Sequence, residues 1–82
     1  MWEVQYTSEA RAQRATLPAP ARRAMDEMIE RLGSDPWQGS RYRAGYPPEY
    51  RMFSFGEWGL VVYVVHERRR VLVLLDVLWA GP

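Results

Sequence analysis

The sequence of 82 residues contains no cysteine and no lysine, and His66 is its single histidine. The missing cysteines exclude disulfide bonds, thiol catalysis and thiolate metal ligands. A lone histidine makes a metal site improbable, and we expect no cofactor. No apolar run approaches the ~18 residues that a membrane helix needs, and no charged-then-apolar leader is seen. We therefore expect a soluble, cytoplasmic protein without a membrane partner.

The net charge of the chain is also small. The 11 arginines and 10 acidic residues leave a net charge of +1, which does not by itself indicate a nucleic-acid partner. The apolar share of 48% is enough for one compact core. A chain of this length has no room for a second core, so we expect residues 1–82 to form one domain.

The first part of the chain predicts a strand and a short helix. The apolar residues that alternate with polar ones, as in a strand with one buried face, are Trp2, Val4 and Tyr6. Thr7 or Ser8 can cap a helix that runs to Ala15, because each side chain can accept a hydrogen bond from an N–H of the first turn.

A longer helix is predicted next. Pro18 and Pro20 suit its start, where a missing N–H costs nothing. Its apolar residues recur at i, i+3, i+4, i+7, i+8 and i+11, and they are Ala21, Ala24, Met25, Met28, Ile29 and Leu32. Gly33 is expected to end this helix in the left-handed conformation. Residues 34–48 are rich in glycine and proline and are expected to form a loop.

Three antiparallel strands are predicted at residues 50–55, 58–66 and 70–79, with turns at Gly56-Glu57 and at residues 67–69. The whole pattern is a strand, two helices and three strands. We therefore predict an α+β fold of βααβββ order, with both helices packed on one face of the antiparallel sheet.

The turns also predict which strand residues face each other. A two-residue turn after Phe55 places Phe53 opposite Leu60 and Arg51 opposite Val62. The face away from the helices, here called the outer face, would then carry Arg51, Phe53, Phe55, Leu60, Val62, Val64, Leu72, Leu74, Asp76 and Leu78.

An apolar outer face is unusual for a sheet with helices on one side only. We therefore expect a partner, a second copy of the chain or the loop at 34–48 to cover it. The predicted interface residues are Phe53, Phe55, Leu60, Val62, Leu74 and Leu78.

Arginines and aromatic residues alternate in the loop at 34–48, which contains Trp37, Arg41, Tyr42, Arg43 and Tyr46. Such side chains can stack on bases and contact phosphates. This pattern makes Arg41, Arg43 and Arg51 candidates for RNA binding. The alternative is a structured loop whose rings pack on the core, and the residues alone leave both open.

The order βααβββ, together with Tyr50-Arg51, Gly56 and Val61-Val62-Tyr63, resembles the RelE/ParE superfamily of bacterial toxins. The resemblance covers nearly the whole chain. It implies a toxin that a cognate antitoxin neutralises. In the RelE branch it implies metal-independent cleavage of mRNA on the ribosome, and in the ParE branch it implies binding to DNA gyrase without cleavage.

RelE-like catalysis would use a depleted set of residues in this chain. The resemblance implies basic residues at two alternating strand positions, an arginine on the next strand, and a basic residue with Tyr or His at the C-terminus. The first position falls on Arg51, which is the one catalytic candidate, whereas the next two fall on Phe53 and Leu60. The chain is therefore interpreted as an atypical mRNA-cleaving toxin, with a ParE-like gyrase binder or an inactive interaction module as alternatives.

Three further titratable residues lie on or near the predicted strands. Asp76 stands among leucines and is expected to pair with Arg51 or Arg43, although a general base is the alternative. His66 is expected to be a surface residue at the far hairpin. Glu57 lies in the first turn and is a weaker candidate for accepting a proton.

Overall fold

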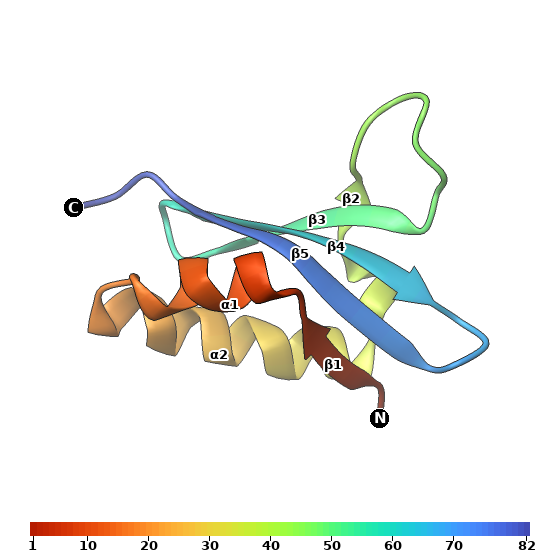
Figure 1. Ribbon diagram of the computed structural model, residues 1–82, viewed down its shortest axis with the longest axis horizontal. Helices are drawn as coiled ribbons and strands as arrows, with labels where there is room; N and C mark the ends of the chain where they lie inside the picture. The colour runs from red at the N-terminus through yellow and green to blue at the C-terminus, as the bar shows by residue number, and fades with distance from the viewer.

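A computed structural model describes residues 1–82 and shows two helices on one face of a five-stranded sheet (Figure 1). The elements are β1 (Glu3–Tyr6), α1 (Ser8–Ala15), α2 (Ala19–Ser34), the 3-10 helix η1 (Pro36–Gln38), β2 (Ser40–Arg41), β3 (Tyr50–Phe55), β4 (Gly59–His66) and β5 (Val71–Trp79). The strand order is β1-β5-β4-β3-β2, with β1 parallel to β5 and every other pair antiparallel. The predicted α+β class is confirmed, and the predicted elements follow one another as expected, with η1 and the short strand β2 in addition.

Helix α1 begins as the sequence predicts. The Thr7 side chain accepts a hydrogen bond from the Ala10 N–H at 3.1 Å and so caps the helix. Helix α2 follows Pro18, and its buried stripe includes Ala21, Met25, Met28 and Leu32. Neither helix combines the length and the apolar character that a membrane crossing requires.

The predicted end of α2 is wrong. Gly33 is helical and has no positive φ, and α2 continues to Ser34 before Asp35 leaves it in an extended conformation. The Gly33 carbonyl accepts a hydrogen bond from the Trp2 N–H at 2.9 Å. A contact with the start of the chain, which the local sequence cannot reveal, therefore takes the place of the expected cap.

Residues 34–48 are more ordered than the predicted loop. They form η1 and then β2, which pairs Ser40 with Met52 and Arg41 with Arg51. Gly39 joins these two elements, and a Cβ at this position would clash with the Tyr63 hydroxyl and the Met52 carbonyl. The remaining residues, 42–49, project from the edge of the sheet on the side away from the helices (Figure 1).

Strands β3 and β4 are paired one residue away from the predicted register. The turn has three residues, Gly56–Trp58, so Phe53 faces Val61 and Arg51 faces Tyr63. Since side chains alternate between the two faces of a strand, a shift of one residue moves the odd-numbered residues of β3 to the helix side. Arg51 therefore lies on the inner face. The prediction that it lies on the outer face is wrong.

Strand β5 contains a β-bulge that the sequence analysis missed. Val62 faces Asp76, but the next residue, Tyr63, faces Leu74, so Leu75 has no partner on β4. An extra residue in one strand changes the alternation beyond it. The bulge therefore keeps Asp76 on the outer face while Leu74 points into the core.

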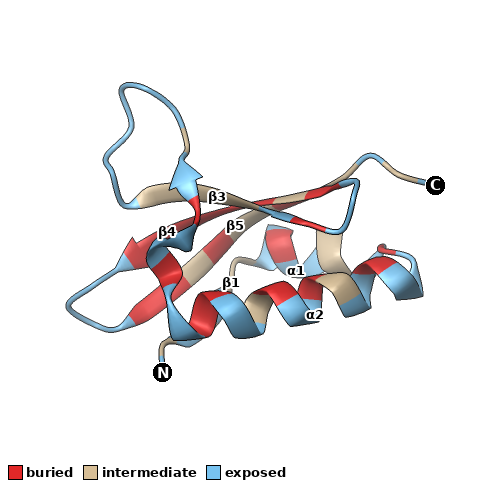
Figure 2. Ribbon diagram, turned by 180° about the vertical axis from the view of Figure 1, so that it is seen from behind, coloured by how far each residue is buried: buried red, intermediate tan, exposed pale blue.

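The core lies between the sheet and the helices, as the alternating buried face of α2 shows (Figure 2). Phe55 and Leu74 are 1% and 0% exposed, and Phe53 packs against the same cluster. The prediction that these three residues lie on the outer face is wrong, and so is the placement of Leu72, which is also buried in the core. The register shift and the bulge account for all four errors.

The outer face is apolar even though its members have changed. It carries Tyr50, Met52 and Ser54 on β3, Leu60, Val62, Val64 and His66 on β4, and Val71, Val73, Asp76 and Leu78 on β5. Leu60, Val62 and Leu78 lie on this face as predicted. Leu78 is 47% exposed, and Trp58 in the adjoining turn is 52% exposed, so this end of the outer face presents apolar surface to solvent.

Candidate functional site

Arg51 holds the segment that follows α2. Its Nε donates a hydrogen bond to the Gly39 carbonyl at 3.0 Å, Nη2 donates to the same carbonyl, and Nη1 donates to the Pro48 carbonyl at 3.1 Å. Its guanidinium carbon also lies 5.3 Å from the centre of the Trp37 ring, a cation–π contact. All these contacts are internal, so the structure gives the predicted catalytic arginine a structural role.

Tyr63 also forms hydrogen bonds with the segment that follows α2. Its hydroxyl donates to the Pro36 carbonyl at 2.7 Å and accepts from the Gly39 N–H at 3.2 Å. Burial raises the pKa of the Tyr63 phenol above its ordinary value of 10.0, while the hydrogen bond from Gly39 and the charge of Arg51 oppose this shift. The phenol therefore remains neutral and serves as a fixed donor and acceptor.

Asp76 pairs with neither Arg51 nor Arg43, and that prediction is wrong. Its Oδ1 accepts a hydrogen bond from Gln13 Nε2 at 3.2 Å, and Gln13 Oε1 accepts one from the Val77 N–H at 2.7 Å. The side chain of Gln13 thus supplies a hydrogen-bond acceptor to the part of β5 that does not pair with β1. Sequence reasoning missed Gln13 because residues so far apart in the chain give no periodic signal.

The outer face offers few groups that could move a proton. Its carboxylate, Asp76, is held by Gln13, and His66 lies at the other end of β4 from the exposed Leu78. The outer residues of β3 include no cation. Glu57 is exposed in the β3–β4 turn. No group of three or more His, Cys, Asp or Glu side chains is arranged to hold a metal ion.

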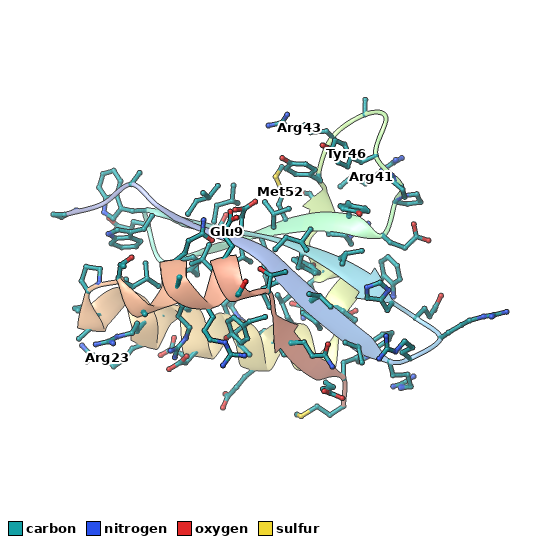
Figure 3. All side chains as sticks on the ribbon, viewed as in Figure 1. Glu9, Arg23, Arg41, Arg43, Tyr46 and Met52 are labelled. Atoms are coloured by element: carbon teal, nitrogen blue, oxygen red, sulfur yellow. The ribbon has the colours of Figure 1, made fainter.

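The three predicted RNA-binding arginines do not form one site. Arg51 points to the inner face, whereas Arg41 and Arg43 are exposed at the projecting segment (Figure 3). Arg41 Nη2 donates to the Tyr46 carbonyl at 3.0 Å, and the guanidinium carbon of Arg43 lies 4.9 Å from the centre of the Tyr42 ring. Arg41 and Arg43 are therefore exposed, whereas the guanidinium group of Arg51 is occupied by internal contacts.

A shallow basic pocket of about 220 Å³ was not predicted. It is lined by Tyr6, Arg11, Arg14 and Ala15. Arg14 also forms an ion pair of 2.7 Å with Asp26 on α2, and that hydrogen bond raises the pKa of the Arg14 guanidinium. Burial raises the pKa of the Tyr6 phenol. The ion pair connects two helices, so spacing rules within one helix could not find it.

Comparison with known proteins finds similarity in the fold and not in the sequence. No family model and no curated protein matches the sequence. A chain of the intact RelBE toxin–antitoxin complex of E. coli superposes with a TM-score of 0.85 over 100% of both chains, at 14% identity. A chain of the RelBE2 toxin–antitoxin complex of Mycobacterium tuberculosis has a TM-score of 0.85, at 19% identity, over 99% of this chain and 93% of that one.

A chain of the chromosomal ParDE toxin–antitoxin system of P. aeruginosa is also similar, with a TM-score of 0.69 and 17% identity over 99% of this chain and 98% of that one. At such identities the agreement concerns the backbone and not the residues that carry out chemistry. The resemblance seen in the sequence is confirmed for the fold, and the chain has the RelE/ParE toxin fold.

Proposed function

We propose that this chain is the toxin of a toxin–antitoxin pair and that it acts by binding its target through the outer face, without cutting RNA. The fold it shares with chains of the RelBE and ParDE systems supports the toxin class and a cognate antitoxin. The observation that carries the binding mechanism is the outer face itself, which is apolar and has no arginine.

Ribosome-dependent mRNA cleavage, the first hypothesis from the sequence, finds less support. Attack of a ribose 2′-OH on the next phosphate requires a proton acceptor, a proton donor and a cation for the developing charge. Arg51 is hydrogen-bonded to two carbonyls on the inner side, Phe53 packs on the core, and Leu60 is apolar. The three strand positions that would supply these groups are therefore occupied or uncharged.

Apolar surface at one end of the outer face suits a protein partner. Leu60 and Leu78 face each other across β4 and β5, and Trp58 lies in the turn next to them. We call these three residues the Trp58 patch. Complete burial of a large apolar side chain contributes about 1.5–3 kcal/mol. Leu78 and Trp58 are already about half buried, so an antitoxin that covers the Trp58 patch would gain about half of this energy from each of them. It would also keep the target away from the same surface.

Growth assays with charged variants test the role of the Trp58 patch. Expression of the chain without its antitoxin is expected to arrest bacterial growth, and Leu78→Asp is expected to relieve the arrest because it places a charge in the patch. Ala12→Asp introduces the same charge on the exposed side of α1 and should leave the arrest intact. Arrest by Leu78→Asp at the wild-type level would contradict the proposal.

The target is tested separately. DNA gyrase is the target that the sequence resemblance implies for a ParE-like toxin, and inhibition of gyrase supercoiling by the purified chain would identify it. Unchanged supercoiling would remove gyrase and leave another protein as the target. Analytical ultracentrifugation of the isolated chain tests whether a second copy covers the Trp58 patch. A dimer that Leu78→Asp dissociates would assign the patch to that second copy.

A further inference from the structure

The basic pocket lies where β1 leads into α1, on the helix side of the sheet (Figure 1). We call it the Arg11 pocket, and its lining residues are Tyr6, Arg11, Arg14 and Ala15. Its volume is about 220 Å³, whereas pockets for drug-sized ligands occupy about 300–1,000 Å³. The Arg11 pocket therefore suits a smaller molecule.

The spacing of three lining residues along α1 creates the pocket. Residues at i, i+3 and i+4 share one face of a helix, so Arg11, Arg14 and Ala15 are neighbours on the surface of α1. Ala15 has only a methyl group and leaves a hollow beside the two longer side chains. Tyr6 lines the hollow from β1, and its ring packs against the core. The pocket thus joins an apolar wall to two guanidinium groups.

The guanidinium group of Arg14 is held in place but is not fully used. Its Nη2 donates to Asp26 Oδ1 on α2 at 2.7 Å, and no other hydrogen bond uses the five N–H groups of this side chain. Its Nε is buried and has no acceptor. A buried donor without an acceptor is unfavourable. An oxygen-rich ligand in the pocket would give the Arg14 guanidinium group further acceptors.

Arg11 has no partner at all. The contact between Arg14 and Asp26 is the one ion pair in the molecule, so the charge of Arg11 is not neutralised by a carboxylate. Like charges on neighbouring positions of a helix face repel each other. Arg11 and Arg14 carry two positive charges and Asp26 carries one negative charge, which leaves an excess of one positive charge. An anion in the Arg11 pocket would remove both the excess and the repulsion.

Tyr6 adds a neutral hydrogen-bond donor. Burial raises the pKa of its phenol above the ordinary value of 10.0, while the charge of Arg14 opposes this shift. The hydroxyl therefore keeps its proton at neutral pH. Donors on α1 and on β1 thus surround one hollow. Guanidinium groups form strong, often bidentate hydrogen bonds with phosphate oxygens, and the oxygens of a phosphate point in several directions, unlike the two coplanar oxygens of a carboxylate.

We propose that the Arg11 pocket binds the phosphate group of a small molecule, held between Arg11 and Arg14 and against Tyr6. The inference does not depend on the proposed function. The Arg11 pocket lies between β1 and α1, whereas the Trp58 patch lies on the outer face and in the β3–β4 turn.

The experiment titrates the ¹⁵N-labelled chain with inorganic phosphate and with glycerol 3-phosphate, and follows backbone amide signals by NMR at constant ionic strength. The amides of Tyr6 and of residues 11–15 should shift and saturate with a Kd on the order of 1 mM, as expected for a ligand with few contacts. Equal affinity for both probes would support a site for the phosphate group alone. Tighter binding of glycerol 3-phosphate would support a site that also holds the organic part.

Two variants test the lining, each with a matched control. Arg11→Gln should weaken binding by about 1.5- to 5-fold, the range for one exposed ionic contact. Arg23→Gln removes the same charge from an exposed arginine of α2 that lines no pocket, and it should leave the affinity unchanged (Figure 3). Ala15→Leu fills the hollow without any change of charge and should abolish saturation. Ala12→Leu makes the same substitution on α1 outside the pocket and should bind as wild type does.

Four results would overturn the inference. They are shifts that do not saturate up to about 20 mM phosphate, far above the expected Kd, wild-type affinity in Ala15→Leu, equal losses in Arg11→Gln and Arg23→Gln, and acetate shifts equal to those of phosphate. Leu78→Asp should bind phosphate normally, so failure of this inference is distinguishable from failure of the proposed function.

Discussion

Replacement of Arg51 separates a structural role from a catalytic one. In the structure its guanidinium group donates to the carbonyls of Gly39 and Pro48 and contacts Trp37. Arg51→Ala removes all these contacts and leaves the carbonyl of the buried Gly39 without its donor. The variant should therefore lose stability as well as the fixed position of residues 36–48.

The expected loss follows from the individual contacts. A hydrogen bond from a charged donor to the Gly39 carbonyl contributes about 1.5–3 kcal/mol. The exposed bond to Pro48 and the contact with Trp37 contribute about 0.5 kcal/mol each. The free energy of unfolding should thus fall by about 2.5–4 kcal/mol, which corresponds to a drop in Tm of roughly 10–30 °C for a domain of this size.

Thermal unfolding followed by circular dichroism measures this drop, and Arg23→Ala serves as the control, with a change within about 0.5 kcal/mol. Arg51→Lys keeps the charge but cannot reach both carbonyls as the guanidinium fork does, so its Tm should fall between those of Arg51→Ala and wild type. An Arg51→Ala variant with the Tm of Arg23→Ala, but without any growth arrest, would refute this reasoning and make Arg51 a functional cation.

Three more predictions concern the buried support of the same segment. Tyr63→Phe leaves the Pro36 carbonyl and the Gly39 N–H unsatisfied and should cost about 2–4 kcal/mol in urea unfolding, whereas Tyr50→Phe should change little. Gly39→Ala should cost at least about 1–3 kcal/mol, since its Cβ would clash with the backbone of Met52, while Ser40→Ala should be tolerated. The pKa of Tyr63 is raised in the folded state, so its contribution is complete below the unfolded pKa of about 10 and is lost as the pH rises further. Urea unfolding above pH 10 should show a steeper fall for wild type than for Tyr63→Phe, and parallel curves would contradict this assignment.

The sequence predicted the elements that depend on local rules. The Thr7 cap and the apolar stripe of α2 follow from neighbouring residues, and the three C-terminal strands follow from alternation and turns. The strand register required knowledge of the turn length, since a third turn residue moved Phe53 and Phe55 from the outer face into the core. The bulge at Leu75 left no local signal at all.

The roles of the candidate site residues depend on contacts between residues that are far apart in the chain. The sequence predicted the apolar outer face correctly because both faces of β4 are apolar, whichever register applies. It could not predict that Gln13 would bind Asp76, or that the carbonyls of Gly39 and Pro48 would occupy Arg51. Both contacts arise only when helices and loops pack on the sheet, and they decide which charged groups remain for chemistry.

Mapping of transcript 5′ ends during growth arrest tests the binding mechanism most directly. The wild-type chain should arrest growth while transcripts remain intact, and Leu78→Asp should restore growth. New 5′ ends that appear within coding sequences on induction and disappear in Arg51→Lys would contradict it, because they would show that the chain cleaves mRNA with Arg51 in the reaction.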